Sequence, residues 1–217
     1  PMSTLGSHAF CYTVVDACDN ESKLCCEFDV VDNIEPIAVC DDDLHISVGG
    51  QGYARVYAED VDEGSSDNCE LASIEVRRAG GVWGPWVDFD CDDVHNYVTI
   101  ELRVWDAAGN SNICWLEVLV EDKINPYCHA PHNTSLHCDD HELLHIDWDD
   151  FDQLNEVFGE AMAEDNCNAT AEQIGLTNNL NDCGWGYVVR TFQATDDWGL
   201  TSQNSCQQVI TIYEVHN

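Results

Sequence analysis

The sequence has very few basic residues. Seven Lys and Arg stand against 42 Asp and Glu among 217 residues, which gives a formal net charge of -35. A surface of this sign repels phosphate groups, which argues against nucleic-acid and anionic-membrane partners and leaves cations as natural ones. The sequence also has no apolar run of about 18 residues and no charged-then-apolar leader, so we expect no membrane insertion in this segment.

Cysteine, by contrast, is abundant. Thirteen cysteines recur at matching places along the chain, which predicts disulfides and therefore an oxidising, extracellular or cell-surface setting. Buried free thiols in a cytosolic protein are the alternative. Because no leader is present, secretion would be directed by sequence outside these residues.

The chain repeats itself every 90 or so residues. Asp16, Asp106 and Asp196 each follow an apolar run and precede a short polar turn, a cysteine and a second alternating run. Pro36 and Pro126 keep the same spacing. We therefore predict complete domains at 34–122 and 123–217, the second with a short insertion, while residues 1–33 hold the last two strands of an earlier domain. Because two strands alone are marginally stable, we expect the chain to belong to a longer protein.

Alternating apolar and polar residues predict strands. The clearest runs are 53–57, 71–76, 97–105 and 115–120, all rich in β-branched and aromatic residues. Short strands, polar turns and units near 90 residues predict an all-β fold of tandem Ig-like antiparallel β-sandwich domains stapled by disulfides. Residues 149–158 have the spacing of a short helix, although alternation over 157–163 also allows a strand there.

Three landmarks in a fixed order carry a resemblance to a known family. A Pro-x-x-x-Cys opening is followed by Asp67-Asn-Cys69, then by Trp105-Asp-Ala-Ala-Gly-Asn110 and Cys114, and the second copy repeats this order with a different turn, Asp196-Asp-Trp-Gly199. This order resembles the hyalin repeat and related Ig-like repeats. The resemblance implies a large secreted or surface-anchored, often bacterial and marine, protein that builds adhesive fibres. Its implied partners are neighbouring repeats and other copies of the chain.

Each predicted domain has four cysteines at matching places, and four cysteines allow three connectivities. We favour the pairs Cys40–Cys114 and Cys69–Cys91 in the first domain. By repetition we favour Cys138–Cys206 and Cys167–Cys183 in the second. Five further cysteines have no internal assignment and would find partners in an adjacent domain or another chain, namely Cys11, Cys18, Cys25, Cys26 and Cys128.

Acidic residues are dense where the domains join. In an Ig-like sandwich the entry linker, the loop after the second strand and the turn before the last strand lie at one pole, and carboxylates crowded there suit Ca²⁺. The Ca²⁺ ligand candidates are Asp32, Asn33, Glu35, Asp60, Asp62, Asp67, Asp106, Glu121, Asp122, Asn125, Asp165 and Asp196. Bound Ca²⁺ would stiffen the junctions. The alternative is an ordinary solvated acidic surface.

These features predict a structural extender or filament-forming repeat of an adhesive protein, and not an enzyme. A glycan- or protein-binding module is one alternative, for which Trp83 and Trp86 could present two indole rings. A zinc hydrolase is a remote one, because His141-Glu142-Leu-Leu-His145 matches the His-Glu-x-x-His signature. That motif needs a helix, whereas its last residues align with the strand opening at Leu44-His45-Ile46.

Overall fold

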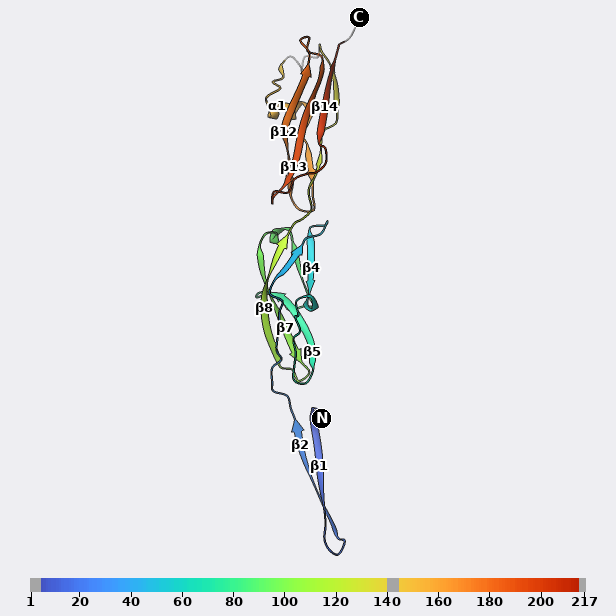
Figure 1. The fold of residues 1–217 in the computed structure, drawn as a ribbon, viewed down its shortest axis with the longest axis vertical. Helices are drawn as coiled ribbons and strands as arrows, with labels where there is room; N and C mark the ends of the chain where they lie inside the picture. Colours follow the sequence, from blue (N-terminus) through green and yellow to red (C-terminus); the bar gives the residue numbers. More distant parts are fainter. Residues whose placement is uncertain (1–4, 140–144, 215–217) are drawn as a thin grey trace. The chain divides into compact units, whose positions relative to one another are not determined.

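The computed structural model describes residues 5–139 and 145–214, in which the regular secondary structure is almost all β-strand, with one α-helix (Figure 1). The chain divides into two compact units. Unit 1 comprises Pro1–Leu44, Val56–Val87 and Thr99–Val118, and unit 2 comprises His45–Arg55, Asp88–Val98 and Leu119–Asn217. Within the described residues, no helix is both long and apolar enough to cross a lipid bilayer.

The first element is an antiparallel hairpin of β1 (Gly6–Val15) and β2 (Glu21–Val30). Cys11 and Cys25 lie directly opposite one another in its register and form a disulfide. The large apolar side chains of the hairpin remain exposed, among them Phe10, Tyr12, Val14, Leu24 and Phe28. The hairpin therefore contributes no buried core of its own.

A four-stranded sheet and a two-stranded sheet follow. Their strand orders are β3-β8-β7-β5 and β4-β6. The strands are β3 (Leu44–Ser47), β4 (Tyr53–Tyr57), β5 (Leu71–Arg78), β6 (Trp86–Asp90), β7 (Tyr97–Asp106) and β8 (Ser111–Glu121). Two single 3-10 turns accompany them, η1 (Ala58–Asp60) and η2 (Cys91–Asp93). The four strands predicted from alternation are confirmed, with β5, β7 and β8 slightly longer than expected.

Alternation along β7 places an acid on the apolar face. Ile100, Leu102 and Val104 are fully buried, and the next residue of this face is Asp106, which is only 3 % exposed. The two-residue period of β7 thus buries the Asp106 carboxylate at the end of the strand, where its charge must be compensated.

The remaining strands repeat this plan. The orders are β10-β14-β13-β12 and β11-β9, with β10 parallel to β14 and the other reported pairs antiparallel. The strands are β9 (Tyr127–His129), β10 (Thr134–His137), β11 (Met162–Glu164), β12 (Ala169–Leu180), β13 (Gly186–Asp196) and β14 (Gln207–Tyr213). Strand β13 buries Val188, Phe192 and Ala194 and then Asp196, as β7 does with Asp106.

The helix predicted over 149–158 is α1 (Phe151–Phe158), with Asp150 as its N-cap accepting from the Gln153 amide. Its buried Leu154 and Phe158 pack in one cluster with Val188 and Ile210. The alternative strand over 157–163 is confirmed only at its end, because β11 begins at Met162, four residues after the helix ends.

One arginine lies inside this core. Arg190 is fully buried and donates to the side chains of Gln173, Gln208 and Asn155 and to the Gly159 carbonyl. Burial lowers its pKa to about 10. Side-chain and carbonyl oxygens therefore replace water as the hydrogen-bond acceptors of this guanidinium. Through these bonds Arg190 connects α1 with the strands that carry Gln173, Arg190 and Gln208.

The disulfides differ from most of the expected pairs. The bonds are Cys11–Cys25, Cys40–Cys114, Cys91–Cys167 and Cys128–Cys206. The favoured pair Cys40–Cys114 is thus present, whereas Cys69–Cys91, Cys138–Cys206 and Cys167–Cys183 are wrong. Cys18, Cys26, Cys69, Cys138 and Cys183 are free.

The geometry of β12 explains one of these errors. Cys167 lies two residues before β12 begins, and Cys183 lies in the turn after it ends. A twelve-residue strand spans roughly 40 Å, whereas a disulfide needs its Cα atoms within about 7 Å. Cys167 and Cys183 therefore cannot bond to each other within one repeat.

Candidate metal centre

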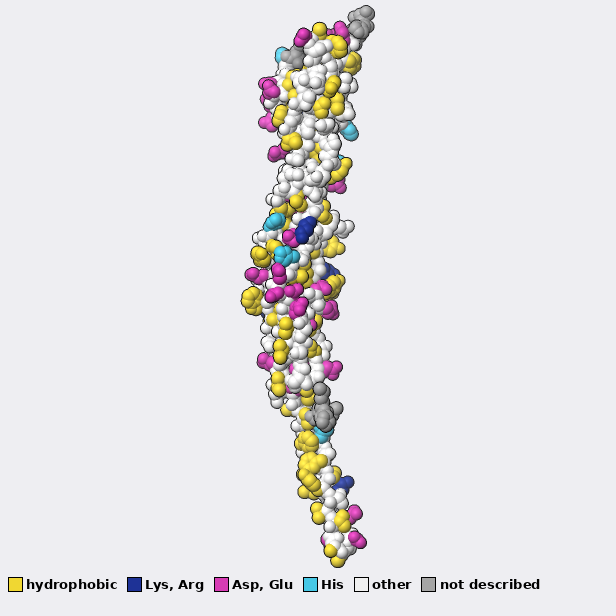
Figure 2. Space-filling model, in the orientation of Figure 1, with side chains coloured by type: hydrophobic (Ala, Val, Ile, Leu, Met, Phe, Trp, Pro, Cys, Tyr) yellow, Lys and Arg dark blue, Asp and Glu magenta, His cyan; other side chains and the backbone are white. Residues whose placement is uncertain are grey.

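Carboxylates are spread over the surface, and Figure 2 shows many acidic side chains and few basic ones on the face in view. Two groups stand out because the repeat places them at equivalent positions. In unit 1, Asp32, Asp67 and Cys69 have ligand atoms within 4.8 Å of one another, and in unit 2 the same holds for Asp122, Asp165 and Asp196. We name these the Asp32 cluster and the Asp122 cluster.

The turn aspartate beside the Asp32 cluster is compensated by hydrogen bonds. Asp106 Oδ1 accepts from the amides of Ala108 and Asn110, and its Oδ2 accepts from Asn110 Nδ2 at 2.7 Å. Burial opposes ionisation of Asp106, but these bonds outweigh it and lower the pKa. Asn110 Nδ2 also lies 3.2 Å from the Asp32 carbonyl oxygen and 3.4 Å from that of Ile34. The side-chain amide of Asn110 thus lies close to three oxygens, one each from Asp106, Asp32 and Ile34.

The Asp122 cluster lacks this amide. Asp196 Oδ1 accepts from the amides of Trp198 and Leu200, as Asp106 Oδ1 does in its own turn. Leu200 stands where Asn110 stands in the preceding repeat, and its side chain has no donor. Asp196 is 6 % exposed, and its Oδ2 is buried without a hydrogen-bond partner. A carboxylate oxygen in this state points to a missing cation or donor.

Two further oxygens in the Asp122 cluster are also without partners. They are Oδ1 of Asp165 and Oδ1 of Asn166, both buried at the atom level. Asn166 turns its Nδ2 to Asp122 Oδ2 at 3.1 Å, which fixes its own oxygen on the opposite side of the amide. Unsatisfied buried acceptors are rare in folded proteins, so three in one cluster are a strong indication of a cation site.

Electrostatics support the same interpretation. Burial raises the pKa of Asp165, and the charges of Asp122 and Asp196 raise it further. Two oxygens bound to one Ca²⁺ at 2.3–2.6 Å lie at most about 4.6 to 5.2 Å apart. The ligand atoms of the Asp122 cluster lie within 4.8 Å of one another, which agrees with this separation. Asp165 and Asn166 also line an open pocket with Tyr127. The donor set fits a hard cation such as Ca²⁺.

The other predicted ligands are placed elsewhere. Asp60 accepts from the Tyr57 amide and Asp62 from the Ser65 amide, so both carboxylates hold local backbone. Glu121 pairs with Lys123 at 2.7 Å, and this contact leads the causes that lower its pKa. Asn125 donates to the Thr201 carbonyl. Asn33 and Glu35 are exposed and belong to neither cluster.

The two tryptophans proposed for ligand stacking are not presented together. The guanidinium groups of Arg77 and Arg103 lie over the Trp83 ring, 4.2 and 4.3 Å from its centroid. Trp86 is half-exposed on β6, in edge contact with Tyr57. Because both guanidinium groups lie over the Trp83 ring, this ring already makes cation–π contacts within the chain.

The zinc motif lies mostly outside the described residues, which exclude 140–144 and hence His141 and Glu142. Just before it, His137, Cys138 and Asp139 have ligand atoms within 4.8 Å of one another. These three are consecutive in sequence and include no further described ligand. We build no site on them.

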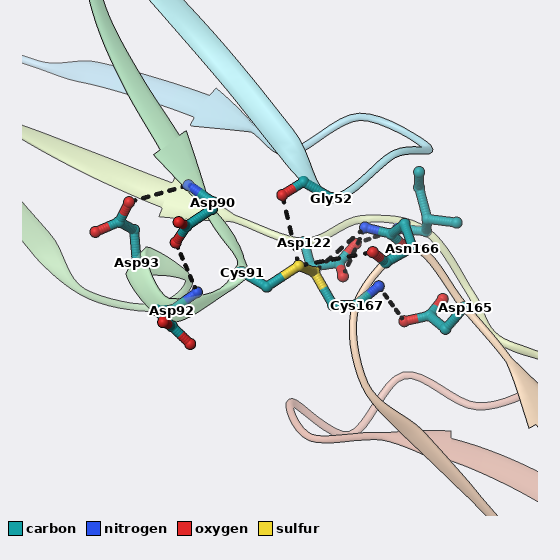
Figure 3. Close-up of a disulfide and its surroundings, with 10 residues drawn as sticks. Gly52, Asp90, Cys91, Asp92, Asp93, Asp122, Asp165, Asn166 and Cys167 are labelled. Atoms are coloured by element: carbon teal, nitrogen blue, oxygen red, sulfur yellow. Dashed lines mark hydrogen bonds between the residues drawn. A yellow bond between two sulfur atoms is a disulfide. The ribbon is translucent and has the colours of Figure 1, made fainter.

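Disulfide Cys91–Cys167 lies next to the Asp122 cluster (Figure 3). Gly52 passes against this bond, with Cys91 Sγ 3.6 Å from its carbonyl oxygen. A Cβ added at Gly52 would lie 2.5 Å from the Asn166 carbonyl oxygen, so only glycine fits there. Sequence spacing indicated neither this bond nor the approach of Gly52.

Comparisons with known proteins add little. No family model and no curated protein matches the sequence, so the hyalin-repeat resemblance stays a prediction. Among solved structures, the insect immune protein hemolin is 12% identical with a TM-score of 0.40, covering 94% of this chain and 56% of its own. The protocadherin gamma B4 extracellular domain is 14% identical with a TM-score of 0.37, covering 96% and 37%. The chain thus spans less than two thirds of these proteins, and TM-scores this low carry no assignment of function.

Proposed function

We propose that this chain is a tandem-repeat segment of an extracellular structural or adhesive protein, stapled by disulfides and stiffened by Ca²⁺ at the Asp122 cluster. The observation that carries the proposal is the set of buried oxygens without partners on Asp165, Asn166 and Asp196. Where Ca²⁺ is abundant, a bound ion would satisfy these oxygens, so the lack of a protein donor would not destabilise the folded chain.

The extracellular setting is supported by the bonds themselves. Four disulfides are formed among the described cysteines, and one of them, Cys40–Cys114, joins residues 74 apart in sequence. Such bonds persist in oxidising compartments and are rare in the cytosol. The strong negative charge keeps copies apart until cations screen it.

The proposed job is to span distance or bear load, in the manner that the hyalin-repeat resemblance suggests. Repeats that each carry an aspartate at the same turn position suit this role better than catalysis, which needs a pocket with convergent reactive groups. Neighbouring repeats and other copies of the chain are the proposed partners, and the exposed apolar face of the β1–β2 hairpin gives them a surface to cover.

The test is Ca²⁺-dependent stability. We expect calorimetric titration to show one dominant Ca²⁺ site, and we expect thermal unfolding to shift upward when Ca²⁺ replaces chelator, because an ion bound only to the folded state stabilises it. Mg²⁺ at the same concentration is the comparison, since it demands a tighter, octahedral site. An unfolding curve unchanged by Ca²⁺ would remove the calcium proposal and leave the fold intact.

A matched pair of variants separates the Asp122 cluster from general acidity. Asp165→Asn keeps the shape and removes one ligand charge, whereas Asp149→Asn makes the same change at an exposed acid outside the cluster. We expect only Asp165→Asn to weaken Ca²⁺ binding. Equal weakening by both would mean that the ion is attracted by net charge alone.

A further inference from the structure

The Cys91–Cys167 disulfide joins two successive repeats of the sequence. Cys91 opens η2, just ahead of β7, in the first repeat, and Cys167 ends the Asp-Asn-Cys segment of the second. Both lie in unit 2, where His95 also stacks on Trp198 at a ring-centroid distance of 6.3 Å. The bond therefore ties the loop ahead of one repeat's Asp106 strand to the acidic loop of the next.

Each of these two positions recurs with a free cysteine. The second repeat has Cys183 ahead of β13, which corresponds to β7, and the first repeat has Cys69 in its Asp-Asn-Cys segment. Both are exposed and unbonded. The strand-length argument excludes a bond between the two positions of one repeat, so for each thiol the counterpart position lies in another repeat.

Cys69 is held as Cys167 is held. Asn68 Nδ2 donates to Asp32 Oδ2 at 3.2 Å, and Asn166 Nδ2 donates to Asp122 Oδ2 at 3.1 Å. The backbone amide of Cys69 donates to the aspartate two residues before it at 2.8 Å, and that of Cys167 does so at 3.3 Å. The free thiol thus sits in the same hydrogen-bonded frame that already presents its counterpart for bonding.

Cys183 is presented in a turn between two paired strands. Its amide donates to Asn181 Oδ1 at 2.9 Å, and the register of β12 with β13 closes at Leu180 and Gly186. An aspartate precedes Cys183, as Asp90 precedes Cys91. The thiol therefore stands at the far end of the repeat from Asp196.

We propose that Cys69 and Cys183 are the two open positions of a head-to-tail series of disulfides of the Cys91–Cys167 kind. Cys183 bonds to the Asp-Asn-Cys cysteine of another repeat, which in a second copy of this chain is Cys69. The recognised partner is a repeat of this same type. The inference rests on the tandem-repeat part of the proposed function but not on Ca²⁺.

Each bond forms by oxidation of two thiols. Two sulfurs join and release two electrons and two protons to a disulfide oxidant such as glutathione disulfide, which becomes two glutathione thiols. The reaction is best tested at about pH 8.5, where a larger fraction of an ordinary cysteine thiol is ionised.

The experiment has two arms, which distinguish the two sources of the partner repeat. In the first arm, the full chain is oxidised with glutathione at high concentration and the linked species are mapped by non-reducing peptide mass spectrometry. In the second arm, a further copy of residues 31–122 is appended after Asn217 and Cys69 of the original repeat is changed to Ser, so that a repeat with its own Asp32 follows Cys183 and supplies the only Cys69 of the polypeptide. We expect a peptide linking Cys183 to Cys69 in the disulfide-linked dimers of the first arm and in the monomeric fraction of the second.

Controls make the outcome specific. Cys183→Ser should abolish the link, whereas Cys18→Ser, at another exposed free cysteine, should leave it unchanged. The absence of reduced Cys40 and Cys114 peptides reports that both copies of the repeat have folded. The inference is overturned if Cys183 stays reduced in both arms, or if it bonds to Cys18, Cys26 and Cys138 as readily as to Cys69.

Discussion

The side-chain amide of Asn110 donates a hydrogen bond to Asp106 Oδ2 at 2.7 Å. A neutral donor from the same turn thus compensates the buried carboxylate at the end of β7. The corresponding aspartate of the next repeat, Asp196, faces Leu200 and keeps an oxygen without a partner. Two turns at equivalent positions of successive repeats thus differ in what compensates the aspartate. A hydrogen-bond donor serves the first, and we propose that a cation serves the second.

Leu200→Asn should convert the second turn into the first. The new amide can donate to Asp196 Oδ2, and a hydrogen bond to a charged group contributes about 1.5 kcal/mol or more, so we expect stability in chelator to rise by that order. Because the amide competes for the cation position, Ca²⁺ affinity should fall by about tenfold or more, which corresponds to 1.4 kcal/mol. Denaturant unfolding in chelator and calorimetric titration measure the two effects.

Asn110→Leu is the reciprocal control. It leaves Asp106 Oδ2 without a donor, so we expect a loss of about 1–3 kcal/mol in the free energy of unfolding without Ca²⁺. Ca²⁺ should then recover part of that loss. If Leu200→Asn and the parent chain bind Ca²⁺ equally, the space that an amide at position 200 would occupy is not part of the Ca²⁺ site.

Asp165 should make stability depend on pH in an unusual direction. Burial and two neighbouring acids raise its pKa above the ordinary 3.8, so the folded chain binds this proton more readily than the unfolded chain does. Stability from this group is therefore present below pH 3.8 and is lost as pH rises through the raised pKa. In chelator, Asp165→Asn should remove this loss.

The comparison must be made between variant and parent chain, because other acids act the opposite way. Hydrogen bonds lower the pKa of Asp32 and of Glu75, and their stabilisation is lost on acidification. We therefore expect the difference in unfolding free energy between Asp165→Asn and the parent to grow from acid to neutral pH, and to shrink when Ca²⁺ is added. A pH-independent difference would contradict the crowding of charges at Asp165.

Gly52→Ala should disturb the bond between repeats. Gly52 has φ of +73°, and an added Cβ would lie 2.5 Å from the Asn166 carbonyl oxygen and 3.0 Å from Cys91 Sγ. Either the loop or the disulfide must move, so Cys91–Cys167 should be reduced at a lower dithiothreitol concentration. Thiol alkylation followed by mass spectrometry reads this directly.

Gly50→Ala is the matched control, because an added Cβ there meets nothing within 4 Å. It should leave the reduction of Cys91–Cys167 unchanged. If Gly52→Ala behaves like Gly50→Ala, the close approach at Gly52 does not support the bond.

Removing the Cys40–Cys114 bond should cost more than removing the hairpin bond. The two cysteines are 74 residues apart, against 14 for Cys11–Cys25, and loop-closure entropy predicts about 4 kcal/mol for the longer loop. We expect Cys40→Ser with Cys114→Ser to lower the unfolding temperature strongly. The double change at Cys11 and Cys25 should lower it less, and the reverse order of effects would contradict the entropic account.

Much of the fold could be predicted from local pattern. The runs at 53–57 and 97–105 are strands because alternation with β-branched residues specifies a surface with one buried side. The same period carries Asp106 and Asp196 to the buried face, and repetition of these turns locates both acidic clusters. Composition does not reveal which carboxylates accept from backbone amides, as Asp60 and Asp62 do, and only the structure shows those bonds.

The sequence by itself determined the repeat, the strand plan, the acidity and the number of cysteines, because each of these depends on neighbouring residues or on simple counts. Only the tertiary structure decided which cysteines bond and which oxygens lack partners. Pairing depends on which ends of long strands come together, and so Cys91 bonds to Cys167 of the next repeat. The need for a cation at Asp196 depends on whether a donor reaches one buried atom, and that is a matter of packing in three dimensions.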